Sequence, residues 1–189
     1  MPLGRADTDL NDRTWTLGRG TSTSEACRSC GREEVSELSL VWRIAEHGWA
    51  ECELRTPDER VVVPASYVSD APEDFLSGLA HVCAWGGSTT FTFVGEPAVY
   101  RWTLTAGSGV LEVAVEHRPG PAQAGSVSTP VWRGTFVLST FARASVRAFD
   151  AVVHEHGLAG YEQVWGRPFP TGELEALRSA WRHLGSIGT

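Results

Sequence analysis

Seven short segments with strand-like patterning constrain the fold of this chain more than any other feature. In the first, from Leu38 to Ile44, every second residue is large and apolar, which is typical of a strand with one buried face. Short turns rich in Gly, Pro and acidic residues separate most of these segments, and such turns favour antiparallel hairpins. The predicted strands cover residues 36–45, 49–54, 60–63, 89–94, 98–105, 109–117 and 131–138.

Three further segments have apolar residues at the spacing of an amphipathic helix. The predicted helices cover residues 70–86, 139–157 and 171–185, and a glycine ends each of them. Side chains able to cap a helix stand at the starts of the first two, namely Asp70 and Ser139 or Thr140, and the third helix starts at Thr171. We therefore expect an α+β fold. It has an antiparallel sheet of about seven strands, three and then four, with one inserted helix and two C-terminal helices on one face.

Residues 1–34 differ in composition from the rest of the chain. They are rich in Gly, Ser, Thr, Asp and Arg and contain few large apolar residues, so we expect a flexible N-terminal arm. Residues 35–189 then form a single α+β domain. The chain begins without the apolar stretch of a signal peptide, and no apolar run approaches the ~18 residues of a membrane helix. We therefore expect a cytoplasmic protein that does not enter a membrane.

The basic residues exclude several kinds of chemistry. All 16 are arginines, so the chain cannot use a P-loop lysine, a Schiff-base lysine or a lysine general base. Serines that stand near glycine lie in predicted turns, without a recognisable His or Asp partner pattern. A net charge of −7 argues against nucleic acid as the main partner. Together these observations favour a binding protein over an enzyme.

Negative charge is concentrated in one stretch, which carries −6 of the net −7 between Glu46 and Asp74. Trp49 is predicted to share a strand face with Glu51 and Glu53, and an aromatic side chain among acids is typical of a protein interface. A solvated acidic surface is one interpretation. The other is a face that occludes a basic protein partner, in an immunity-like or regulatory role. The residues predicted to contact such a partner are Trp49, Glu51, Glu53, Asp58 and Glu59.

Cys27 and Cys30 form the most specific local pattern, Cys-x-x-Cys followed by glycine. Two thiolates at this spacing can hold one zinc ion, but a structural site needs four ligands and the chain has no second Cys-x-x-Cys. A zinc-binding protein or zinc-dependent enzyme is therefore the alternative to a protein without a cofactor. A redox pair or two reduced thiols in the arm are further interpretations.

Two other features leave alternatives open. The aromatic segment 160–170 is predicted to be an irregular connection between helices that packs on the core, with a binding loop as the alternative. A small-molecule pocket between sheet and helices, lined by Tyr100, Trp102 and Phe149, is a third functional possibility.

Three motifs resemble a group of small uncharacterised bacterial α+β proteins. They are Ser66-Tyr67-Val68-Ser69-Asp70 at a helix start, Tyr100-Arg101-Trp102 on a later strand, and the segment from Tyr161 to Pro170. The resemblance covers residues 35–185 and implies no assigned activity and no catalytic residue. The size and acidic character of that group are similar to those of immunity proteins that neutralise secreted toxins, which is an analogy of type.

Overall fold

The computed structural model describes residues 38–118 and 127–186. The predicted arm, residues 1–34, lies outside the described residues, and so do Cys27 and Cys30. Within the described part, the α+β fold and the order of its elements are confirmed: three strands, a helix, four strands and two helices.

The first three strands form an antiparallel sheet in the order β1-β2-β3, with bounds Ser39–Ala45, Trp49–Arg55 and Arg60–Ser66. A short 3-10 turn, Glu46–Gly48, joins the first two strands. The register places Trp42 opposite Cys52, and Cys52 opposite Val63. These three side chains are buried, as the alternating pattern predicts for one face of a strand.

The other four strands form a second antiparallel sheet in the order β4-β5-β6-β7. Their bounds are Gly87–Gly95, Ala98–Gly107, Val110–Arg118 and Thr129–Val137. The predicted grouping of three and then four strands is therefore confirmed, and each group has its own hydrogen-bond ladder.

The two ladders adjoin at β3 and β4. A Cβ atom on Gly95 of β4 would lie 3.0 Å from Cγ of Pro64 in β3, so the two strands are close neighbours there. Pro64 has no backbone N–H to donate to a ladder. Beyond it, the backbone N–H of Val94 donates to the hydroxyl of Ser69 at 3.2 Å. The Ser69 side chain thus connects the two sheets at the place where the backbone hydrogen bonds between strands stop.

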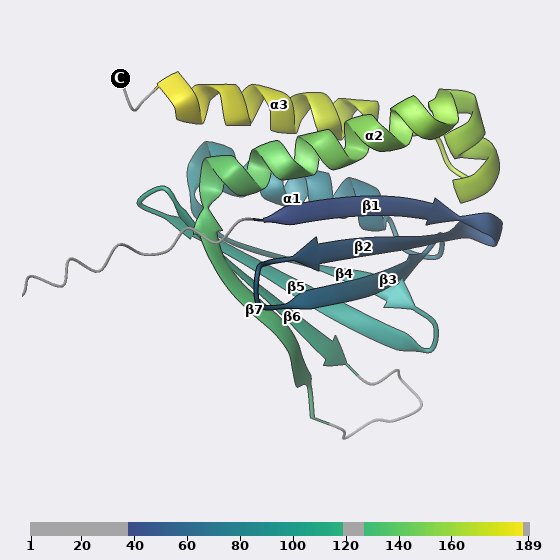
Figure 1. Cartoon of the computed structure of the whole chain (residues 1–189), viewed down its shortest axis with the longest axis horizontal. Coiled ribbons are helices and arrows are strands. Elements are labelled where there is room, and N and C mark those ends of the chain that lie inside the picture. Colours follow the sequence, from purple (N-terminus) through teal and green to yellow (C-terminus); the bar gives the residue numbers. More distant parts are fainter. Residues whose placement is uncertain (1–37, 119–126, 187–189) are drawn as a thin grey trace, which may run out of the picture. The chain divides into compact units, whose positions relative to one another are not determined.

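Three helices cover one face of the strands, as predicted: α1 (Ala71–Trp85), α2 (Leu138–Trp165) and α3 (Thr171–Ser186) (Figure 1). Asp70 occupies the N-cap position of α1, but its side chain makes no capping hydrogen bond. The predicted start of α2 at Ser139 or Thr140 is wrong, because Val137 is the N-cap and both residues lie in the first turn. Within the described residues, no helix is both long and apolar enough to cross a membrane.

The sequence predicts that this helix ends at Gly157, and the backbone does leave the helical region there, at φ 65° and ψ 169°. A further helical segment follows the kink and continues to Trp165, where the sequence predicts an irregular connection. Tyr161 and Trp165 are both fully buried. Their burial stabilises the added turns, so the first part of the aromatic segment 160–170 is helical.

An aromatic cluster fills the space between the strands and the helices. Phe75 of α1 lies at its centre, with ring contacts to Trp42, Phe91, Phe93, Trp102, Phe141 and Phe149. Trp102 and Phe149 are fully buried within this cluster. The expectation that these two residues line a small-molecule pocket is therefore wrong, because their rings pack against other rings and fill that space.

Candidate functional site

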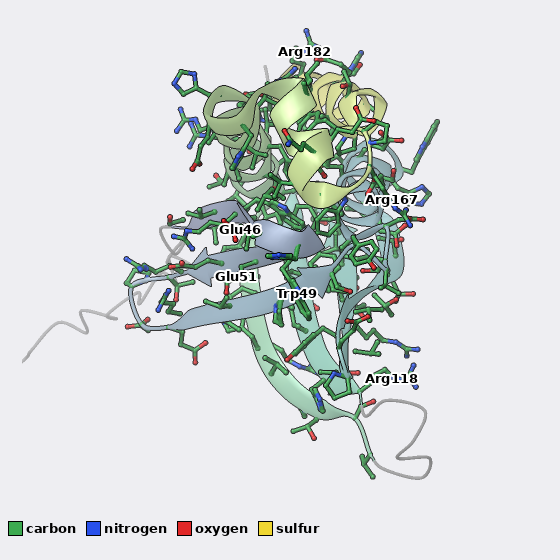
Figure 2. The ribbon with its side chains drawn as sticks, turned by 90° about the vertical axis from the view of Figure 1, so that its right-hand side faces the viewer. Glu46, Trp49, Glu51, Arg118, Arg167 and Arg182 are labelled. Carbon is green, nitrogen blue, oxygen red and sulfur yellow. The ribbon has the colours of Figure 1, made fainter. Side chains whose placement is uncertain are left out.

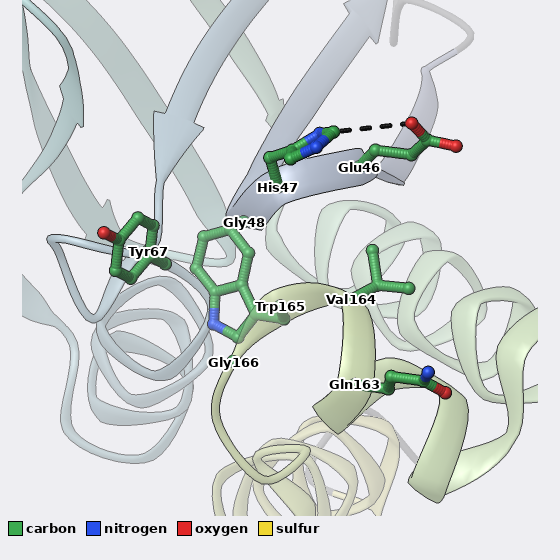
Figure 3. Close-up of a pocket in the computed structure, with 8 residues that line it drawn as sticks. All are labelled: Glu46, His47, Gly48, Tyr67, Gln163, Val164, Trp165 and Gly166. Carbon is green, nitrogen blue, oxygen red and sulfur yellow. Dashed lines mark ion pairs between the residues drawn. The ribbon is translucent and has the colours of Figure 1, made fainter.

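A pocket of about 540 Å³ lies where the β1–β2 turn meets the end of α2 (Figure 3). We call it the corner pocket. Its lining comes from three segments that are far apart in the sequence: Glu46, His47, Gly48, Tyr67, Gln163, Val164, Trp165 and Gly166. The side chains of Glu46 and His47 are 92% and 84% exposed, so this rim of the pocket is open to water.

The β1–β2 turn is shaped by two residues with positive φ, His47 at 63° and Gly48 at 74°. The carbonyl of Gly48 accepts a hydrogen bond from the backbone N–H of Tyr67 at 2.8 Å. A Cβ atom on Gly48 would lie 2.6 Å from Cδ1 of Tyr67. Glycine at this position therefore allows the tyrosine ring to lie directly against the turn.

The opposite side of the pocket is the end of α2. Gly166 adopts the left-handed conformation and its N–H donates to the carbonyl of Glu162 at 2.8 Å, which ends the helix. Trp165 is fully buried, and its Nε1 has no hydrogen-bond partner among the described residues. Arg167, the next residue after Gly166, forms an ion pair with Asp70. The charge of Arg167 is therefore matched within the fold.

Two of the residues predicted to contact a partner lie near the corner pocket. Trp49 is half-buried and Glu51 is exposed, and Figure 2 shows both on the same side of the molecule as Glu46. Trp49 pairs across the ladder with Ser66, the residue before Tyr67. Tyr67 itself is 51% exposed. We call Glu46, Trp49, Glu51 and Tyr67 the corner surface. Glu46 and Tyr67 line the pocket, whereas Glu51 lies outside its lining, opposite Arg43 in the ladder.

The structure does not place Glu53 in that surface. Its side chain is only 4% exposed and forms ion pairs with Arg43, Arg55 and Arg60, at 2.6, 3.0 and 2.8 Å. Hydrogen bonds from Arg60 and Arg43 lower the pKa of Glu53 to about 2. The expectation that Glu53 is an exposed contact for a basic partner is wrong, because three guanidinium groups already surround its carboxylate. We call this the Glu53 cluster.

The other predicted contacts lie elsewhere. Asp58 and Glu59 are exposed in the β2–β3 turn, which is at the opposite end of β2 from the corner pocket. The backbone N–H of Glu59 donates to the hydroxyl of Thr56 at 3.1 Å, which holds that turn. The five predicted residues therefore do not form one contact patch.

Glu73 in the first turn of α1 has a different environment from the exposed acids. Glu73 is half-buried, and burial is the main cause of the rise in its pKa. Burial raises the pKa of Tyr161 as well, with a smaller contribution from Glu73. The negative charge counted between residues 46 and 74 is thus distributed over several environments.

Within residues 38–118 and 127–186, no group of three or more His, Cys, Asp or Glu side chains is arranged to hold a metal ion. Cys52 and Cys83 are buried free thiols, and burial raises the pKa of Cys83 to about 12. Zinc binding by Cys27 and Cys30 stays a prediction because neither residue is described.

The fold and the site together define an α+β domain with an open pocket at one end of its three-stranded sheet. Comparison with protein-family models, with curated proteins and with solved structures found no match to this chain. The site itself is therefore the basis for a functional proposal.

The corner pocket could not be predicted from the sequence. Its His47-Gly48 turn is visible as a hairpin signal, and a binding loop is one interpretation of the aromatic segment 160–170. Nothing in the sequence shows that Tyr67 closes the gap between them, because that contact depends on the path of the chain after β3.

Replacing Gly48 with alanine is expected to destabilise the protein more than the same change at Gly109. Both glycines have similar positive φ, 74° and 78°, but a Cβ atom meets Tyr67 at Gly48 and nothing within 4 Å at Gly109. We expect a loss of about 1 kcal/mol at Gly109 from backbone strain, and about 1 kcal/mol more at Gly48. Urea denaturation of both variants measures the difference. Equal losses would show that Tyr67 does not pack against this turn.

Proposed function

We propose that this protein is a non-enzymatic binding protein and that the surface around the corner pocket binds a basic segment of a protein partner. The observation that supports this is an open pocket of about 540 Å³ with the exposed carboxylate of Glu46 on its rim. A second exposed carboxylate, Glu51, lies on the same side of the molecule (Figure 2). Arg167 beside the pocket is paired with Asp70, so it does not oppose an incoming cation with an unmatched charge.

The chemistry of the site fits an arginine or lysine side chain. An exposed tyrosine ring attracts a cation by about 0.5–1 kcal/mol, and Tyr67 offers such a ring at the pocket. Carboxylates near the rim raise the rate of encounter with a basic partner. Trp49 adds a partly buried aromatic contact of the kind that anchors interfaces.

The proposal includes the cellular setting expected from the sequence. We infer a cytoplasmic protein with an immunity-like or regulatory role, which acts by covering part of its partner and needs no cofactor. The net charge of −7 supports a basic protein and not a nucleic acid as that partner. Its mechanism is occlusion: charge brings the partner in, and the aromatic contacts slow its release.

Binding of a fluorescent arginine-rich peptide to the full chain tests this proposal. Removing both charges with Glu46→Gln and Glu51→Gln is expected to weaken binding about tenfold at low salt. Tyr67→Ala is expected to weaken it further through loss of the ring.

Glu112→Gln is the matched control, because Glu112 is an exposed carboxylate on β6, outside the corner pocket. We expect it to change the affinity by less than about twofold. An equal effect per charge removed in the control and in the corner variant would mean that the peptide responds only to net charge, and the proposed site would be rejected.

A further inference from the structure

A second pocket lies at the other end of the three-stranded sheet, between the start of β1, the β2–β3 turn and the first turns of α2. It has a volume of about 520 Å³ and is lined by Leu38, Ser39, Arg55, Thr56, Pro57, Thr140 and Arg143. We call it the arginine pocket. Among the described residues, its lining contains two guanidinium groups and no carboxylate, so its charge is opposite to that of the corner surface.

The two arginines are held differently. Nη2 of Arg55 donates to Oε1 of Glu53 at 3.0 Å, which anchors the guanidinium at the edge of the Glu53 cluster while its side chain stays 59% exposed. Arg143 is exposed on α2, and it makes no hydrogen bond or ion pair with another described residue. One arginine is thus positioned in advance, and the other is able to close on a ligand.

The start of α2 adds to the positive character of the pocket. Val137 at the N-cap makes no side-chain capping hydrogen bond. The backbone N–H of Leu138 donates to the carbonyl of Gly109, but the next amides of a helix have no partner within the helix itself. Thr140 brings this first turn to the pocket wall. Helix N-termini and arginine forks both favour anionic oxygens.

We propose that the arginine pocket binds an oxyanion, the phosphate or carboxylate group of a small ligand. The proposal is based on the two arginines in the described lining, the volume of the pocket and the lack of an acid in that lining. This site is independent of the proposed function, because it shares no residue with the corner pocket. The shared chemistry is an anionic oxygen group between Arg55 and Arg143.

Titration of the full chain with inorganic phosphate tests the proposal, with amide chemical shifts as the readout and ionic strength held constant with chloride. We expect saturable shifts at Ser39 and Thr140. Arg143→Gln is expected to raise the dissociation constant at least about fivefold. Arg147→Gln is the matched control, because Arg147 is exposed one turn further along α2 and does not line the pocket. We expect it to change the constant by less than about twofold.

Absence of saturable phosphate binding to the native chain would overturn the proposal. So would equal losses from Arg143→Gln and Arg147→Gln.

Discussion

Replacing Phe75 with alanine is expected to lower the free energy of unfolding by about 3–5 kcal/mol. Phe75 is fully buried in α1. Its ring meets Trp42 of the first sheet at 5.9 Å and Trp102 of the second sheet at 5.7 Å, both measured between ring centroids. It also stacks on Phe149 of α2 at 6.2 Å. Truncation therefore opens a cavity that borders both sheets and a second helix.

Chemical denaturation followed by circular dichroism measures this loss. Phe75→Leu keeps part of the volume and is expected to cost less than half as much. Ser77→Ala is a control on the same helix, because Ser77 is exposed, and we expect a change within about 0.5 kcal/mol. Because Phe75 contacts both sheets, the native chain should unfold in one transition. A loss below about 1 kcal/mol for Phe75→Ala would show that the aromatic cluster is not a shared core.

The strands could be predicted because alternation marks the buried face directly, as it does for Trp42 and Cys52. The position at which the hydrogen-bond ladder ends could not be predicted, because alternation along one strand carries no information about its neighbouring strands. The border between the two ladders depends on the meeting of Pro64 with Gly95 and on the Ser69 hydroxyl. The first of these contacts joins residues 31 positions apart in the sequence, and the second joins residues 25 positions apart.

The helical segment that follows Gly157 could not be predicted, for a different physical reason. A glycine after an apolar helical stretch is a good local stop signal, and the backbone does leave the helical region there. That signal carries no information about the residues beyond the glycine. The helix resumes because Tyr161 and Trp165 reach the core and are fully buried, which is a tertiary effect that overrides the local one.

The candidate site shows that a count of charges along the sequence does not predict which carboxylates are exposed. Glu53 contributes to the acidic stretch, yet arginines on both neighbouring strands turn toward it. Arg43 and Arg60 become its neighbours only once the register of β1, β2 and β3 is known. Trp49 and Glu51 could be proposed from the sequence as partner contacts. Tyr67 and the end of α2 could not be joined to them, because the corner pocket needs three distant segments.

Replacing Glu53 with glutamine is expected to lower the free energy of unfolding by about 2–3 kcal/mol near neutral pH. Removing one member of a buried ion pair costs about 3–5 kcal/mol, and the arginines here are half-exposed, which reduces the effect. Glutamine keeps the shape and one carbonyl oxygen but not the charge that three guanidinium groups share. Glu51→Gln, on the same strand and face but exposed, is expected to change stability by less than about 0.5 kcal/mol.

The pH dependence separates charge from packing in this cluster. The pKa of Glu53 in the folded protein is lowered from 4.5 to about 2, so its carboxylate stabilises the fold fully above the unfolded pKa. That contribution is lost as the pH falls from about 4.5 toward 2. The stability difference between the native chain and Glu53→Gln, measured by urea denaturation, should therefore shrink through this window. A difference that stayed constant from about pH 6 to about pH 3 would mean that glutamine disturbs packing and that the ion pairs contribute little. A shrinking difference would show that the arginines hold β1, β2 and β3 together through this one carboxylate.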